Sequence, residues 1–165
     1  MNKLLISAGA VAALALSTPA LAAPSNQASA NALVNIVSPL TLTKNTDLNF
    51  GTVVGPFTGQ VVHIDNTGAY TCGATLTCSG TQSVANFSLT GTANQNVVLT
   101  IPNSVTLNGS VSGTLSVDLS GDKPVNPTLS AAGTASFNVG GKLTIPAGTV
   151  DGVYSNTFNV TANYQ

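Results

Sequence analysis

Short segments in which apolar and polar residues alternate are the feature that most restricts how this chain can fold. They recur over residues 87–90, 97–101 and 115–119. Each segment has one apolar face, because successive side chains of a strand point to opposite sides. After residue 22, no stretch keeps the three- and four-residue apolar spacing of an amphipathic helix for long. The pattern predicts an all-β chain of about seven to ten short strands, typical of a β-sandwich.

Two dipeptides indicate where strands should turn. Asn108-Gly109 and Gly140-Gly141 both tolerate positive φ at the two central positions of a hairpin turn. We therefore expect each pair to form a two-residue turn between antiparallel strands. The second pair should join the apolar-alternating residues before Gly140 to those after Gly141 in one hairpin.

The first residues have the organisation of a secretory signal peptide. Lys3 precedes an apolar stretch over residues 4–16, and Pro19 is followed by the small-residue pattern of residues 20–22. The apolar stretch is shorter than the ~20 residues of a membrane-spanning helix. We expect a signal peptide over residues 1–22, with cleavage before Ala23 and no transmembrane segment afterwards. The protein should be exported to the periplasm and then to the cell surface or the medium.

The remaining chain is expected to be one domain with a short extension. Residues 23–32 are mostly Ala, Ser, Asn and Gln, which have little to bury, so we predict a flexible N-terminal extension. Residues 33–165 are long enough for a single domain with its own core. Pro39 should separate a strand over residues 33–37 from one over residues 40–43, because proline lacks a backbone donor.

The low charge of the chain argues against a nucleic-acid partner. Charged residues make up 5% of the sequence, and the formal net charge is −1. Nucleic-acid binding requires a basic surface, and only Lys44, Lys123 and Lys142 remain after residue 22. We therefore expect no nucleic-acid partner.

The two cysteines predict a local disulfide. Cys72 and Cys78 lie close together in a chain expected to reach an oxidising compartment. A zinc site would need about four ligands, and His63 is the only histidine, so a metal reading is incomplete. We expect a disulfide and no metal or cofactor.

The sequence offers few groups of residues that could form a catalytic site. His63 and Asp65 should share one face of a strand, and a serine could complete a hydrolase triad, but no nucleophile-elbow sequence accompanies them. Asp118 and Asp122 could contact Ca²⁺, which takes about six to eight oxygen ligands. An exposed polar strand face and a solvated turn are the simpler interpretations. We expect no catalytic residues and predict that the protein is not an enzyme.

An outer-membrane β-barrel is an alternative all-β architecture for an exported chain. Its strands run to about 9–11 residues and carry aromatic girdles at both membrane interfaces. The alternating segments here are mostly half that length, and aromatic residues make up 5% of the chain. The sequence therefore favours the sandwich.

The C-terminus has the longest alternating pattern. From Tyr154 to Tyr164 the even positions are largely apolar, whereas the odd positions from 155 to 163 are Ser, Thr or Asn. A final strand of this kind either closes a sheet or offers an edge that another strand can pair with. We single out the following residues as a candidate assembly strand: Gly152, Tyr154, Phe158, Val160, Ala162 and Tyr164.

This terminus resembles that of chaperone-usher pilus subunits. Tyr164 is penultimate, and Gly152 is the fourteenth residue from the end, as in those subunits. The early Leu48-Asn49-Phe50-Gly51 resembles an element of spore coat protein U-like proteins and archaic pilins. The whole chain after the signal peptide is similar to a neighbouring bacterial family of unknown function.

The resemblance implies an immunoglobulin-like β-sandwich that lacks its last strand and is completed by a donor strand from the next subunit. It implies a pilus-like or coat-like structural subunit, with copies of itself or related subunits, a periplasmic chaperone and an usher as partners. Ala28, Ala30 and Ala32 would then be small residues offered to a groove. Pilins usually tie their first strand to a later one by a disulfide, whereas Cys72 and Cys78 enclose a local loop.

A monomeric binding module, for glycans or surface adhesion, is the alternative from another functional class. Carbohydrate sites favour exposed aromatic side chains. The chain has no Trp and only three Tyr, which favours the structural subunit over the binding module.

Overall fold

The computed structural model describes residues 26–165, so the expected signal peptide lies outside the described residues. The chain divides into two units, residues 1–35 and residues 36–165. Within the first unit, residues 26–35 form neither helix nor strand. The strand expected over residues 33–37 is therefore wrong for the single chain, in which β-structure begins at Thr41. A strand requires a paired neighbour, and no described ladder includes these residues.

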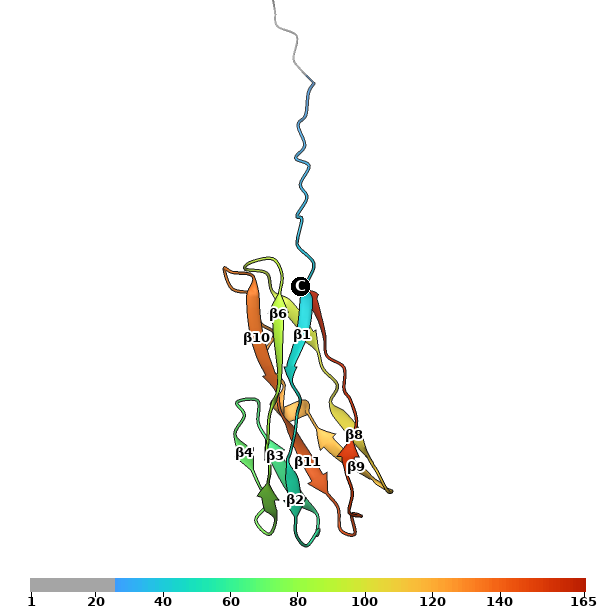
Figure 1. Cartoon of the computed structure of the whole chain (residues 1–165). Coiled ribbons are helices and arrows are strands. Elements are labelled where there is room, and N and C mark those ends of the chain that lie inside the picture. Colours follow the sequence, from blue (N-terminus) through green and yellow to red (C-terminus); the bar gives the residue numbers. More distant parts are fainter. Residues whose placement is uncertain (1–25) are drawn as a thin grey trace, which may run out of the picture. The chain divides into compact units, whose positions relative to one another are not determined.

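Residues 36–165 confirm the all-β prediction (Figure 1). Within this unit there are thirteen strands and one short 3-10 turn, η1 (Ser120–Asp122). Across the described residues, no helix has the length and apolar character needed to cross a membrane. The strands are β1 (Thr41–Thr46), β2 (Thr52–Val54), β3 (Gln60–Ile64), β4 (Tyr70–Thr71), β5 (Thr77–Ser79), β6 (Ala85–Thr90), β7 (Val97–Thr100), β8 (Ser104–Gly109), β9 (Thr114–Asp118), β10 (Thr134–Val139), β11 (Gly141–Ile145), β12 (Tyr154–Ser155) and β13 (Thr161–Tyr164).

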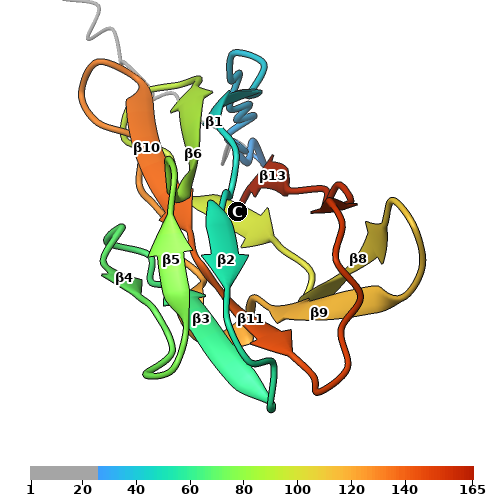
Figure 2. The same cartoon turned by 60° about the horizontal axis from the view of Figure 1, so that its bottom comes forward.

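The strands form two larger antiparallel sheets and two strand pairs. The six-stranded sheet has the order β12-β8-β9-β11-β3-β4, and the three-stranded sheet has the order β1-β6-β10. β2 pairs with β5, and β13 pairs with β7. Two hydrogen bonds between Asn49 and Ser83 bridge the gap between the β1–β6 and β2–β5 ladders. Residues 41–54 are thus paired along most of their length with residues 77–90 (Figure 2).

The core lies between the inner faces of the two larger sheets. Strand β6 buries alternate residues, and Phe87 stacks on its register partner Phe137 of β10 with ring centroids 5.3 Å apart. Strand β11 of the other sheet buries Leu143 and Ile145 in the same apolar cluster. The period-two pattern of the sequence therefore positions both inner faces, and the molecule is a β-sandwich.

Gly140 takes the chain from one sheet to the other. The hairpin predicted at Gly140-Gly141 is wrong, because β10 pairs with β6 whereas β11 pairs with β3 and β9. Backbone atoms of Ile64, Asp65 and Asn66 lie so close to Gly140 that a Cβ atom there would collide with them. Glycine is required at position 140 because the neighbouring backbone lies too close for a side chain. A two-residue hairpin turn also favours glycine, so the sequence alone does not distinguish the two situations.

The turn predicted at Asn108-Gly109 is also displaced. Both residues belong to β8, and Asn108 pairs with Thr114 of β9. The chain reverses over residues 110–113 instead, where the N–H of Gly109 donates to the carbonyl oxygen of Gly113. Gly113 has φ of 80°, so the left-handed conformation is adopted four residues later than the sequence suggested.

Candidate assembly groove and C-terminal strand

Two strand edges that face a common groove lack a pairing partner. β2 pairs on one side with β5, and the described ladders contain no partner for its other side. On the opposite border, β12 pairs only with β8 among the described strands. Unpaired strand edges carry free backbone donors and acceptors and so favour addition of another strand.

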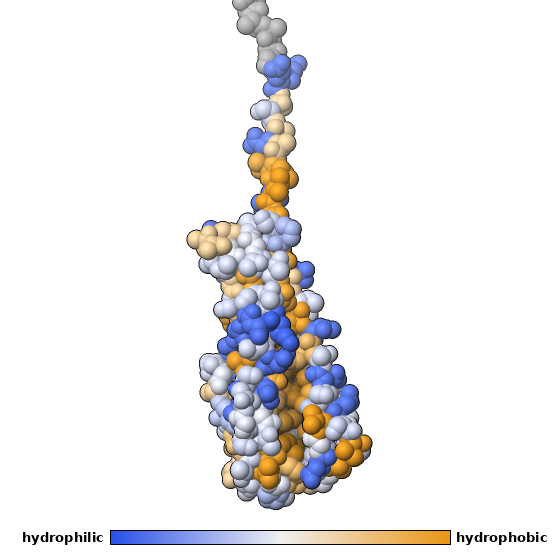
Figure 3. All heavy atoms as spheres, in the orientation of Figure 1, coloured by the Kyte–Doolittle hydropathy of each residue, from blue (hydrophilic) through white to orange (hydrophobic). Residues whose placement is uncertain are grey.

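An apolar groove of about 720 Å³ lies between these borders. One border is formed by residues 48–57, which include β2, and the other by residues 149–158, which include β12. The floor consists of side chains from β8, β9 and β11, among them Leu107, Leu115 and Leu143. In Figure 3 the lower part of the domain shows apolar side chains along a hollow between two more polar margins. The floor side chains are nearly buried, with Leu115 6% and Leu143 5% exposed, so the exposed apolar surface of the groove lies mainly on its borders.

The side chains that border the groove are partly exposed. Val150 and Val153 are 44% and 71% exposed, and Val54 is 58% exposed. The Tyr154 hydroxyl lies 2.7 Å from the carbonyl oxygen of Val150, to which it donates a hydrogen bond, and so holds the 150–154 turn in place. An apolar border left in water favours burial by another chain.

The candidate assembly strand is divided by the structure into two short ladders. Tyr154 begins β12, and Ala162 and Tyr164 belong to β13, whereas residues 156–160 have no assigned strand. Its apolar members are half-buried against the core, and the odd positions are exposed, so the predicted alternation is confirmed. Gly152 lies on the groove border and is exposed. Tyr154 and Phe158 also line the groove, whereas Val160, Ala162 and Tyr164 do not. The role of these residues in assembly stays a prediction.

Tyr164 connects the end of the domain to its beginning. Its hydroxyl donates a hydrogen bond to the carbonyl oxygen of Ser38 and accepts one from the N–H of Thr92, both at 2.8 Å. The N–H of Ser38 in turn donates to the hydroxyl of Thr92 at 2.6 Å. A Cβ atom at Gly91 would collide with the Tyr164 hydroxyl. Sequence reasoning identified Tyr164 but missed Ser38, Gly91 and Thr92, which carry no motif of their own.

The predicted disulfide is confirmed, with a Cα–Cα distance of 6.1 Å between Cys72 and Cys78. Cys72 follows β4, which pairs with β3 in the six-stranded sheet, and Cys78 lies within β5, which pairs with β2. The bond does not cap a hairpin, because β4 and β5 are not paired with each other. The bond links the sheet edge at β4 to the ladder that borders the groove.

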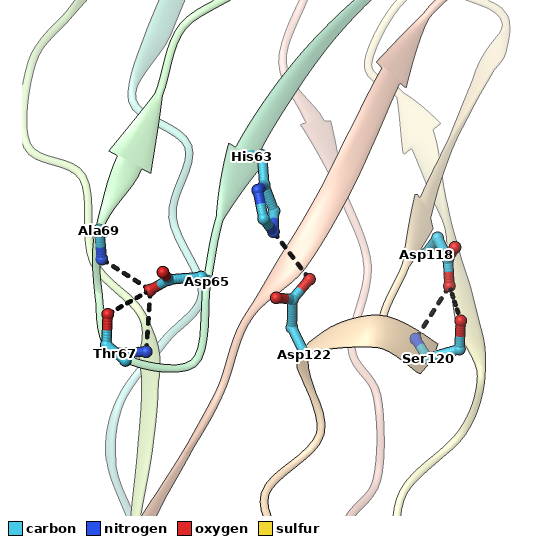
Figure 4. Close-up of polar contacts among 7 residues, drawn as sticks. All are labelled: His63, Asp65, Thr67, Ala69, Asp118, Ser120 and Asp122. Atoms are coloured by element: carbon cyan, nitrogen blue, oxygen red, sulfur yellow. Dashed lines mark hydrogen bonds and ion pairs between the residues drawn. The ribbon is translucent and has the colours of Figure 1, made fainter.

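The titratable residues considered for catalysis are held in separate local contacts (Figure 4). His63 Nε2 lies 2.9 Å from Asp122 Oδ2, so the partner of His63 is Asp122 and not the neighbouring Asp65. Asp65 instead accepts bonds from the Thr67 hydroxyl and from the N–H groups of Thr67 and Ala69. The hydrogen bond from the Thr67 hydroxyl is the main cause that lowers the pKa of Asp65 below its ordinary value. This arrangement organises a turn and does not form the triad considered above.

Asp118 has a similar local role. Its carboxylate accepts hydrogen bonds from the hydroxyl and the N–H of Ser120, and these two bonds lower its pKa. Asp122 contacts His63 and is not grouped with Asp118. Among the described residues, no three His, Cys, Asp or Glu side chains are placed to hold a metal ion together. The carboxylates considered for Ca²⁺ are thus accounted for by contacts within the chain.

The fold and the groove define a class: an all-β sandwich whose two border strands leave an apolar groove open between them. Residues 40–164 match the model of the family described as "Domain of unknown function (DUF4402)", and the chain belongs to this family. The match extends from just before β1 to the penultimate Tyr164. No curated protein and no solved structure matches the chain. The resemblance to chaperone-usher pilins and spore coat protein U-like proteins stays a prediction.

Proposed function

We propose that this protein is an exported structural subunit of a pilus-like or coat-like bacterial surface assembly, and that its subunits join by addition of a β-strand. The observation that supports the proposal most directly is the apolar groove between two unpaired strand edges. A strand placed there would receive main-chain hydrogen bonds from the edges and side-chain pockets from the floor. The subunit's partners would be further copies or related subunits, brought together by a periplasmic chaperone and an usher.

The energetics favour an occupied groove. The exposed side chains of Val54, Val150 and Val153 lie at its borders, and burial of apolar surface contributes about 25 cal/mol per Å². The backbone edges also gain hydrogen bonds that water would otherwise supply, each worth about 1 kcal/mol net. In a protein that functions as a monomer, we would expect a segment of its own chain to cover such an apolar groove.

Polymer formation tests the proposal. The full chain would be expressed in a bacterial host, and the exported product analysed by size-exclusion chromatography and by gel electrophoresis with and without heating. We expect a ladder of multiples of the subunit mass that collapses to a single band when heated. Purely monomeric protein in native extracts would contradict the proposal and favour the monomeric binding module.

The C-terminal strand provides a second test with a matched control. Tyr164→Ser removes the contacts to Ser38 and Thr92 and should abolish polymers or lead to degradation of the exported protein. Asn163→Ser changes the exposed neighbouring position of β13 and should leave polymers unchanged. Wild-type polymer yield from Tyr164→Ser would contradict a role of this strand in assembly.

A further inference from the structure

We infer that the free edge of β10 (Thr134–Val139) pairs in antiparallel orientation with β10 of a second copy of this chain. The contact joins the three-stranded sheets of two copies into one continuous sheet. No residue of β10 lines the groove between β2 and β12, so this edge is a separate interaction surface. The pairing of two copies does not depend on the proposed function.

β10 has none of the features that protect the other border strands from pairing with another chain. The two larger sheets end in β1, β10, β12 and β4. β12 and β4 have two residues each, and β1 contains Lys44 and a bulge between Lys44 and Thr46. Short length, lysine and bulges all hinder pairing at a sheet edge. β10 has six residues, no charge, no proline and an unbroken register with β6.

The main-chain groups of every second residue of β10 point away from β6. Just before the strand, the carbonyl oxygen of Gly133 accepts a hydrogen bond from the N–H of Gly91 and so points toward β6. In the same planar peptide, the N–H of Thr134 points the opposite way. This direction alternates along a strand, so the N–H and carbonyl groups of Ser136 and Asn138 also point to the free side.

Ser136 and Asn138 leave these main-chain groups without a protein partner in the described part of the chain. The N–H and the carbonyl oxygen of Thr134 both bond to Ser130, in the turn before the strand. For Ser136 and Asn138 there is no corresponding turn, and β10 forms a ladder with β6 alone. Figures 1 and 2 show β10 at the border of its sheet, with no strand on its other side. An added strand would replace the water that these groups otherwise bind.

A second β10 fits this edge in a register that uses the free groups of both copies. When the Phe137 residues of the two copies lie opposite each other, Ser136 of each copy faces Asn138 of the other. Each of these two pairs can exchange two main-chain hydrogen bonds. The register keeps buried side chains on the inner face and polar ones on the outer face. Neither β6 nor β10 has a charged residue, so no like charges meet across the contact.

The size of the contact determines how it would act. One pair of six-residue strands buries far less than the roughly 1,200–2,000 Å² of a stable interface, so a single contact is weak. Between two polymers the same contact would repeat along their length and gain strength through multivalency. We therefore expect dimers of single subunits that dissociate on dilution, and side-by-side pairing of any polymers formed as proposed above.

The experiment uses the full exported chain and variants in one row of the three-stranded sheet. Ser136→Pro removes an N–H that faces the free side, and the β6 ladder does not use this group. Ser136→Lys and Ser136→Asp each bring like charges close together when two identical copies pair. Thr43→Lys is the matched control. Thr43 is exposed, and it lies in the same row as Ser136, through Ser88, but at the opposite border of the sheet.

Sedimentation velocity over a dilution series measures the pairing of subunits, and electron microscopy measures the pairing of polymers. We expect wild type and Thr43→Lys to pair reversibly without heating. Ser136→Pro and Ser136→Lys should weaken the association constant by at least about tenfold, with unchanged circular dichroism. An equimolar mixture of Ser136→Lys and Ser136→Asp should pair again, because opposite charges then lie close together.

Three results would overturn the inference: wild type that does not pair at the highest concentration, equal pairing by folded Ser136→Lys, or a mixture of the Lys and Asp variants that stays unpaired. Heat-sensitive polymers that remain single would overturn it while the proposed function stands. Dissociable dimers that need Ser136, in the absence of heat-sensitive polymers, would support the inference and contradict the proposed function.

Discussion

The hydroxyl of Tyr164 donates a 2.8 Å hydrogen bond to the carbonyl oxygen of Ser38, 126 residues earlier in the chain. The same hydroxyl accepts a hydrogen bond from the N–H of Thr92. The Tyr164 side chain therefore links β13 to Ser38, which precedes β1, and to Thr92, which follows β6. Ser38 lies three residues before Thr41, the first residue of β1. The penultimate tyrosine therefore holds in place the residues that lead into β1.

The first prediction separates these hydrogen bonds from the packing of the ring. Tyr164→Phe keeps the half-buried ring but leaves the Ser38 carbonyl oxygen and the Thr92 N–H without this partner. We expect a loss of about 1–2 kcal/mol in the free energy of unfolding, measured by urea denaturation. Stability equal to wild type would show that water replaces the hydroxyl at no cost.

The second prediction concerns the disulfide. Replacing both Cys72 and Cys78 by Ser removes a short-range crosslink, and in the chain-entropy model a loop of this length contributes about 2 kcal/mol. We expect the double variant to fold and to unfold at a lower denaturant concentration. Thiol labelling of the denatured wild type should detect no free thiols. Complete loss of folding would mean that the link between β4 and β5 contributes more than loop entropy.

The sequence predicted the class of fold because a period of two is a local property. Phe87, Leu143 and their alternating neighbours identify their own buried faces, whichever strands they pair with. The sheet that each strand joins was not predictable in this way. Gly140 has the sequence of a hairpin turn but serves a crossing between sheets, and this depends on its distance from residues 64–66.

Of the candidate site, only the C-terminal strand was predictable from the sequence. The alternation from Tyr154 to Tyr164 indicated a terminal strand, and residues 23–32 were expected to form a flexible extension with little to bury. The groove itself is formed by β2, by the 149–153 turn and by the floor strands, which are far apart in sequence. The apolar–polar alternation of a strand does not show whether its edge will lie across a groove from another unpaired strand edge.

The third prediction concerns the N-terminus. The expected cleavage before Ala23 can be checked by the intact mass of the exported protein, because residues 1–22 would be absent. A mass that still includes Lys3 would contradict the signal peptide.

The fourth prediction is an acid-dependent loss of stability. Hydrogen bonds lower the pKa of Asp65 and of Asp118 in the folded state, with the Thr67 and Ser120 hydroxyls as the largest causes. A depressed folded-state pKa contributes stability above the unfolded value of about 3.9, and this contribution is lost as the pH falls through the folded value. We expect the unfolding midpoint of wild type to fall below about pH 4.

Two variants assign this effect to Asp65. Asp65→Asn removes the titrating group, and Thr67→Val removes the hydroxyl that donates to it at 2.6 Å. Both should show a shallower dependence of the unfolding free energy on pH below about 4 than wild type. Identical pH profiles for all three proteins would assign the acid sensitivity to other groups.

The fifth prediction concerns the crossing between the sheets. Gly140→Ala places a Cβ atom against backbone atoms of Ile64, Asp65 and Asn66, and backbone cannot move aside as a flexible side chain can. The crossing would have to shift, and with it the register of β11 against β3, in which Gly141 pairs with Ile64. We expect a loss of at least about 3 kcal/mol in the free energy of unfolding, at the upper end of the cost of overpacking.

Gly121→Ala is the matched control for this change. No atom lies within 4 Å of a Cβ atom built at Gly121, so the same methyl group should alter stability by less than about 0.5 kcal/mol. The two variants would be compared by urea denaturation under identical conditions. Similar stability of the two would mean that the 64–66 turn moves freely. The crossing would then not fix the position of β11, whose Leu143 and Ile145 form part of the groove floor.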